Sequence, residues 1–221
     1  MKIVFPILMM IALLLGLAAC GGKTEPEPSE TPAETTADAA IDTEAADGQD
    51  DAAADPADAQ QTTGARTLVV VFSATGTTKG VAEKIADLEK ADLYEIKAAQ
   101  EYTDADLNWH DSGSRTTLEQ NDKSARPEIG SERISLEGYE KIYIGYPIWW
   151  GEEPRIMDTF VESYDFTGVT VIPFCTSGGS GVGRSGQNLA DNAGTGNWLE
   201  GQCFSGSVTE AELQSWIDGL N

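Results

Sequence analysis

Three short segments of this sequence carry residue types suited to holding a ligand, and each follows an apolar run. The first offers four hydroxyl groups and a glycine ahead of an expected helix: Ser73, Thr75, Gly76, Thr77 and Thr78. Hydroxyls and backbone N–H groups at a helix start can surround a phosphate, assisted by the helix dipole. The segment lacks the GK[ST] ending of loops that bind nucleoside triphosphates, so it predicts a site for a phosphate monoester. The alternative is an ordinary capped helix start.

The second segment contains two adjacent tryptophans and comprises Pro147, Ile148, Trp149, Trp150 and Gly151. Two neighbouring indoles in a loop expose a large apolar surface unless they cover something flat. One is therefore expected to stack on an aromatic ligand while the other packs inward. The alternative is that both cover the edge of a sheet.

The third segment is rich in glycine and comprises Thr176, Ser177, Gly178, Gly179, Ser180 and Gly181. Such a loop lets the backbone approach a planar ring and donate N–H groups to it. The glycines at 181, 183 and 186 also match the GxGxxG dinucleotide fingerprint. That match is weak, because it begins several residues after its strand and belongs to the fourth strand rather than the first.

The apolar patterning indicates how these segments are brought together. Strands are expected at 67–72, 92–96, 141–146, 169–175 and 202–204, and helices at 81–88, 154–164, 185–191 and 209–220. This alternation predicts a parallel sheet covered by helices on both faces. Ligands of such sheets bind beyond the carboxyl ends of the strands, where all three segments fall. The polar stretch 97–140, with short helices expected near 105–108 and 115–123, either approaches the ligand or covers the sheet.

The three segments together resemble the flavodoxin family. The similarity lies in VVVFSATGTTKGVAEKIA, GYPIWWGEEPRIMDTF and FCTSGGSGVGRSGQNL, and NDKSARPEI (Asn121–Ile129) is similar to a segment of flavodoxin-like lipoproteins. The resemblance covers nearly all of residues 66–221. It implies an α/β fold, a doubly wound five-stranded parallel sheet in the order 2-1-3-4-5, and a non-covalently bound FMN.

The resemblance also implies roles for individual residues. Ser73, Thr75, Gly76, Thr77 and Thr78 would hold the FMN phosphate. Trp149 or Trp150 would flank the ring, and the segment 176–181 would meet its other edge. No counterpart of the tyrosine that usually stacks in flavodoxins is assigned. Glu152 and Glu153, next to the ring, are expected to disfavour an anionic reduced flavin and so lower its reduction potential.

No side chain is expected to act as a catalytic acid or base, because the flavin itself would carry the electrons. An FMN-binding electron carrier is the favoured function, since its acidic surface would dock weakly with a positively charged redox partner protein. The alternatives are an FMN-dependent oxidoreductase acting on quinones and an empty flavodoxin-like binding module. His110 is expected to be a bystander.

Composition excludes several other classes of protein. The formal net charge of −23 disfavours nucleic acid, because such a surface repels a polyanion. One histidine and three cysteines without CxxC spacing give no metal site. Cys175 and Cys203 are expected to be two separate buried thiols, with a disulfide as the alternative if their strands are adjacent.

The first 65 residues differ in character from the rest. Residues 1–19 have the positive start and apolar run of a signal peptide, and Leu17–Cys20 resembles a lipobox, which implies an acylated Cys20. The alternative is an uncleaved anchor, and either places the protein outside the cytoplasmic membrane as a membrane-anchored protein. Residues 21–65 carry 12 acids and one lysine, so 20–65 is expected to be a disordered linker ahead of a domain at 66–221.

Overall fold

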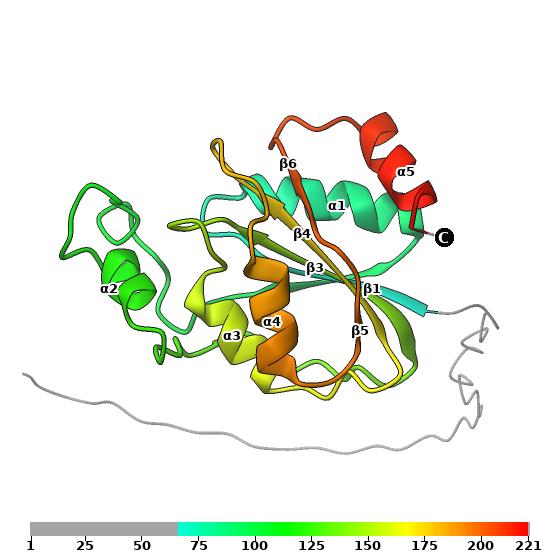
Figure 1. Cartoon of the computed structure of the whole chain (residues 1–221), viewed down its shortest axis with the longest axis horizontal. Helices are drawn as coiled ribbons and strands as arrows, with labels where there is room; N and C mark the ends of the chain where they lie inside the picture. Colours follow the sequence, from blue (N-terminus) through cyan, green and yellow to red (C-terminus); the bar gives the residue numbers. More distant parts are fainter. Residues whose placement is uncertain (1–65, 221) are drawn as a thin grey trace, which may run out of the picture. The chain divides into compact units, whose positions relative to one another are not determined.

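The computed structural model describes residues 66–220, in which helices and strands alternate (Figure 1). The elements are β1 (Arg66–Phe72), α1 (Thr77–Glu89), β2 (Asp92–Ile96), α2 (Arg115–Asn121), β3 (Tyr139–Pro147), α3 (Arg155–Glu162), β4 (Thr170–Thr176), α4 (Ser185–Ala193), β5 (Asn197–Trp198), β6 (Gln202–Phe204) and α5 (Glu210–Asp218). The expected signal peptide, Cys20 and the linker lie outside the described residues. Within 66–220, no helix combines the length and apolar character needed to cross a membrane.

All strands of the sheet pair in parallel, in the order β2-β1-β3-β4-β5, which confirms the expected topology. The fifth position is shared by two short strands, because β6 also pairs with β4. The break in pairing between β5 and β6 lies opposite Pro173 of β4, which has no N–H to donate to a neighbouring strand. Asn197–Trp198 was not expected from the sequence, whereas Gln202–Phe204 was.

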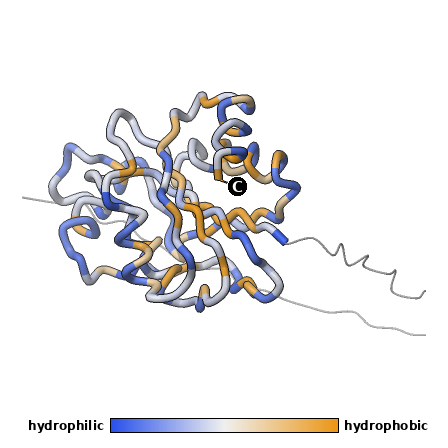
Figure 2. The backbone as a smooth tube through the Cα atoms, turned by 45° about the vertical axis from the view of Figure 1, so that its right-hand side comes forward, coloured by the Kyte–Doolittle hydropathy of each residue, from blue (hydrophilic) through white to orange (hydrophobic). Residues whose placement is uncertain are grey.

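Two apolar layers enclose the sheet. Alternate residues of β1 enter different layers, with Leu68 and Val70 on the face covered by α3 and α4, and Val69 and Val71 on the face covered by α1 and α5. All four side chains are fully buried, as expected for a strand covered on both faces. Figure 2 shows hydrophobic residues concentrated along the strands, with polar stretches in the surrounding loops.

The helix ends follow local sequence signals. Thr209 caps α5 in a complete capping box with Glu212, as the sequence predicts. Pro154 precedes the first residue of α3, where its fixed φ suits a helix start. Helix α1 begins at Thr77, four residues earlier than its apolar pattern indicates, because Gly76 takes the left-handed conformation that starts it.

The long connection between β2 and β3 contains α2 but no second helix; residues 104–107 form a turn instead. An isolated antiparallel bridge pairs Ala98, two residues after β2, with Ile129, and so closes the part of the connection that contains α2. In Figure 1 the connection extends past the carboxyl ends of β1 and β3. It therefore lies at the edge of the sheet where a ligand is expected. Of the two alternatives for residues 97–140, this agrees with an approach to the ligand.

Candidate functional site

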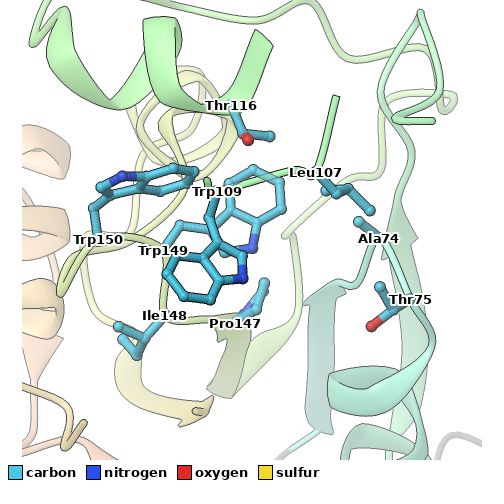
Figure 3. A pocket seen from close by; sticks show the side chains of 9 residues that line it. All are labelled: Ala74, Thr75, Leu107, Trp109, Thr116, Pro147, Ile148, Trp149 and Trp150. Carbon is cyan, nitrogen blue, oxygen red and sulfur yellow. The ribbon is translucent and has the colours of Figure 1, made fainter. Parts of the chain in front are cut away.

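A cavity of about 330 Å³ opens at the carboxyl ends of β1 and β3 (Figure 3). It is lined by Ala74, Thr75, Leu107, Trp109, Thr116, Pro147, Ile148, Trp149 and Trp150. The first two residues follow β1, the last four follow or end β3, and the middle three come from the β2–β3 connection. The structure thus brings parts of the first two predicted segments together around one space.

The two adjacent tryptophans have different environments. The Trp149 ring packs edge-on against Phe72, with ring centroids 5.6 Å apart, and against Tyr102, with centroids 5.3 Å apart. Trp150 is 43% exposed. Trp149 is therefore the inward-packing member of the pair, and Trp150 is the one free to stack on a ligand, which is the division that the sequence predicts.

Trp109 is a lining residue that the sequence analysis did not select. Its side chain is 67% exposed, the largest exposure among the large apolar side chains described. The turn that carries it is fixed to α2, because the N–H and the hydroxyl of Thr116 both donate to the carbonyl of Asp106, at 3.2 and 2.6 Å. Its only sequence signal was an aromatic residue within an otherwise polar stretch.

The tryptophan turn, defined as Trp149–Glu152, holds Trp150 in an unusual conformation. The N–H of Trp149 donates to the carbonyl of Glu152 at 2.9 Å, and the reverse bond measures 3.0 Å. The two central residues, Trp150 and Gly151, have φ of 50° and 82°. A positive φ is uncommon for a bulky residue and costs about 1–3 kcal/mol, and such strain clusters at functional sites.

The first predicted segment leaves a helix terminus open to an anion. Gly76 precedes α1 with φ 83°, and no side chain caps the helix. The first N–H groups of α1 are thus without a side-chain acceptor, and an ideal Cβ on Gly76 would meet nothing within 4 Å. The Thr75 and Thr77 hydroxyls lie 3.3 Å apart at this terminus. Ser73 is half-buried just before it.

Two of the predicted phosphate- and ring-binding hydroxyls face each other instead of a ligand. Thr78 and Thr176 are both buried, and their Oγ1 atoms lie 2.8 Å apart. Their hydroxyls join the start of α1 to the end of β4. Lys79 is likewise engaged elsewhere, because its Nζ forms an ion pair with Glu95 Oε2 at 2.8 Å. The anion site therefore relies on dipoles and hydroxyls.

The third predicted segment borders open space but contributes no lining to the cavity. Ser177 Oγ accepts hydrogen bonds from the N–H groups of Gly179, at 3.1 Å, and Ser180, at 2.8 Å. The backbone N–H groups of Gly179 and Ser180, which were expected to donate to a ligand ring, are thus directed to Ser177. Ideal Cβ atoms on Gly178, Gly179 and Gly181 would meet nothing within 4 Å, which leaves room beside this loop.

The two acids after the tryptophans, Glu152 and Glu153, differ from each other in pairing and exposure. Glu152 accepts from Arg155 Nη2 at 2.6 Å and from Lys123, and the hydrogen bond from Lys123, followed by that from Arg155, lowers its pKa. Its charge is therefore compensated by two cations, and its expected effect on the reduction potential of a bound flavin stays a prediction. Glu153 is 1% exposed, and burial raises its pKa to about 7.

The other candidate groups are accounted for. His110 is exposed beside Trp109 and does not line the cavity. Cys175 and Cys203 are register partners on β4 and β6, and both are free thiols, as expected. Cys175 is buried, but Cys203 is partly exposed, so the expectation that both are buried was wrong for Cys203. Among residues 66–220, no group of three or more His, Cys, Asp or Glu side chains could hold a metal ion.

Comparisons with known proteins agree on one family. The model of the flavodoxin family matches residues 66–220. A candidate flavoprotein from Bacteroides uniformis ATCC 8492 is 44% identical, with a TM-score of 0.67 over 70% of this chain and 99% of its own. Another from Bacteroides eggerthii DSM 20697 is 43% identical, with a TM-score of 0.67 over 71% and 98%.

A third solved structure was determined with a ligand. It is a flavoprotein from Lactobacillus acidophilus NCFM in complex with FMN, 25% identical, with a TM-score of 0.53 over 70% of this chain and 99% of that one. No protein with a curated description matches. Because the family model spans well over half of the chain and two structures of more than 40% identity align along nearly their whole length, this chain belongs to the flavodoxin family.

Proposed function

We propose that this chain is an FMN-binding electron carrier held outside the cytoplasmic membrane by a lipid anchor. Family membership and the FMN complex of the Lactobacillus relative support FMN as its cofactor. The observation that carries the proposal is the pairing of two features on one sheet edge. An uncapped helix terminus suits a phosphate monoester, and a tryptophan-lined cavity suits a flat aromatic ring.

The residues present fit the parts of FMN. The N–H groups at the start of α1, with the hydroxyls of Thr75 and Thr77, would hold the phosphate without a paired cation. Trp150 and Trp109 would cover the ring, with Trp149 as a fixed wall behind them. Bound FMN supplies reversible electron transfer, while the chain orients it and limits its contact with water.

An FMN-dependent reductase of quinones is the second candidate. The exposure of Trp109 and Trp150 favours it, because exposed indoles at the cavity mouth offer a stacking surface for a planar acceptor. Stopped-flow reduction separates the two functions. A carrier takes electrons from a membrane donor and not from NADH, whereas turnover of a quinone with NADH would replace the carrier assignment.

The first test is a spectrum of the purified protein. After dialysis against excess FMN, it should show bound flavin absorption, and titration should quench flavin fluorescence to saturation. A colourless protein with no heat of mixing would overturn the redox assignment. The substitution Thr77→Val, which removes a hydroxyl at the terminus, should weaken FMN more than riboflavin, because riboflavin lacks the phosphate.

The anchor and the partner are tested separately. Acylation of Cys20 predicts a lipid-sized mass increase on that residue and membrane association lost in Cys20→Ser. A Cys20→Ser protein that still fractionates with membranes would overturn the lipid tether. The redox partner is expected to carry a positively charged docking face, so reduction should slow as ionic strength rises.

A further inference from the structure

A cluster of buried charges, formed by Glu153, Arg155 and Asp158, adjoins the tryptophan turn, and these residues do not line the cavity. At its centre is Arg155, the first residue of α3, which is 2% exposed. Its Nη2 donates to Glu152 at 2.6 Å and to the carbonyl of Gln120 at 3.3 Å. Arg155 therefore joins the last residue of the turn to α2.

Gln120 holds the same turn from α2. Its Nε2 donates to the carbonyl of Trp149 at 3.0 Å and to that of Glu153 at 3.1 Å. The first residue of the strained turn, Trp149, and the residue that follows the turn, Glu153, are thus held by one amide, and that amide belongs to a side chain only 6% exposed. Gln120 and Arg155 together fix where the turn presents Trp150.

Glu153 is the least compensated carboxylate of this cluster. Arg155 Nη1 lies 3.3 Å from both Glu153 and Asp158, so one cation is divided between two buried anions. Asp158 has a second guanidinium, that of Arg126, at 4.0 Å. Within residues 66–220, Arg155 is the one cation paired with Glu153. The carboxylate also accepts from the amide of Asn188, at 3.2 and 3.1 Å from its two oxygens, and from its own backbone N–H.

The groups that face Glu153 come from every neighbouring element. They are Arg155 and Asp158 of α3, Glu152 of the turn with its partner Lys123, Arg126 behind Asp158, Tyr146 of β3, and the neutral Asn188 and Asn192 of α4. Burial raises the pKa of Tyr146, so it stays neutral. Burial raises the pKa of Glu153 to about 7, and it also raises the pKa of Asp158, the other carboxylate that shares Arg155.

We propose that Glu153 is a proton-linked positioning residue, whose ionised form keeps Arg155 against the tryptophan turn and whose protonation loosens the turn and weakens flavin binding. When Glu153 is neutral, Arg155 loses one of the anions that hold Nη1 and moves toward Asp158. Its bonds to Glu152 and to the Gln120 carbonyl then lengthen. The inference rests on the proposed flavin site and adds a pH control to it.

The test measures riboflavin binding to the full chain between pH 5.5 and 8.5. Riboflavin is the probe because the phosphate of FMN titrates in the same range. We expect the dissociation constant of the wild type to rise about tenfold as pH falls through 7, because binding that requires ionised Glu153 must release a proton. Glu153→Gln should be independent of pH and should match the weak, low-pH value.

Two matched variants exclude other origins of the effect. His110→Gln removes the only histidine, and Glu140→Gln makes the same charge change at the far end of β3. Both should keep the wild-type profile. A profile that disappears in His110→Gln, or that persists in Glu153→Gln, overturns the proposal while leaving flavin binding intact.

A measurement on the wild type alone tests the proposal without relying on the correct folding of a variant. Calorimetric titration at pH 7 in buffers of different ionisation enthalpy should report net proton release when riboflavin binds. Release of no protons overturns the role of Glu153. Absence of riboflavin and FMN binding at every pH would instead remove the proposed function, and this inference with it.

Discussion

The Oγ1 atoms of Thr78 and Thr176 lie 2.8 Å apart although the residues are 98 positions apart in the chain. Both side chains are buried, so this single hydrogen bond connects the start of α1 to the end of β4 beneath the candidate site. It couples the predicted phosphate loop to the predicted ring loop.

Removing one of these hydroxyls should destabilise the protein. Thr78→Val leaves the Thr176 hydroxyl buried without its partner, which costs about 1–3 kcal/mol. Chemical denaturation should show this loss, and the double substitution Thr78→Val/Thr176→Val should recover part of it because no hydroxyl is then orphaned. A double variant that loses the sum of both single effects would show that the hydrogen bond does not couple the loops.

Trp109 should contribute to flavin affinity despite its exposure. Trp109→Ala removes a wall of the cavity, and we expect FMN affinity to fall about tenfold, the effect of losing one aromatic stacking contact. Iodide should also quench the bound flavin more readily. Leu118→Ala provides the control, because Leu118 is 57% exposed on α2 but does not line the cavity. Equal effects of both substitutions would argue against a ring contact.

Two glycines with open space beside them should respond in opposite ways to alanine. Gly151→Ala places a Cβ on a residue with φ +82° and should lower the free energy of unfolding by about 1–2 kcal/mol. Gly80→Ala, inside α1 and equally free of neighbours, should raise it by about 0.5–1 kcal/mol. Thermal or urea unfolding of both variants provides the comparison.

The raised pKa of Glu153 predicts a pH-dependent stability difference between wild type and Glu153→Gln. Between pH 4.5 and 7 the folded protein keeps a proton on Glu153 that the unfolded chain releases, so this group stabilises at low pH. That contribution is lost as pH rises through about 7. Glu153→Gln should therefore gain about 2 kcal/mol relative to the wild type between pH 5 and pH 8. A constant difference across this range would contradict the assignment.

The two thiols of the domain should react at different rates. Cys175 is 0% exposed and burial raises its pKa, whereas Cys203 is partly exposed. In a Cys20→Ala background, Ellman's reagent should label one thiol in the native protein and the second only after denaturation. Cys203→Ser should abolish the native reaction. Absence of free thiol in the denatured, unreduced protein would instead indicate a disulfide.

Local patterning was sufficient to predict most of the fold. Buried strands such as 67–72 and helix signals such as Thr209 and Pro154 act within a few residues, and their alternation predicts a parallel sheet. The strand order was implied by the resemblance to the flavodoxin family. Asn197–Trp198 could not be predicted, because its pairing depends on where Pro173 interrupts the ladder of β4. The pairing of Asn197–Trp198 is thus decided by a residue of β4 and not by its own local sequence.

The site was predicted less completely, because several of its features are contacts between distant segments. Hydroxyl-rich and tryptophan-rich loops could be assigned to one sheet edge, but the direction of each side chain could not. Thr78 points at Thr176 rather than outward, and Glu152 is neutralised by Lys123 and Arg155. Trp109 reaches the cavity from the long β2–β3 connection, whose path past the ends of β1 and β3 cannot be read from its local sequence.

The division of the last sheet position into β5 and β6 affects how this protein behaves at high concentration. A strand at the border of a sheet offers a template on which another molecule can add its own backbone. Strands of two and three residues, separated by an interruption opposite Pro173, offer too short a run of free amide and carbonyl groups for such growth. This border of the sheet therefore offers a poor template for fibril-like association.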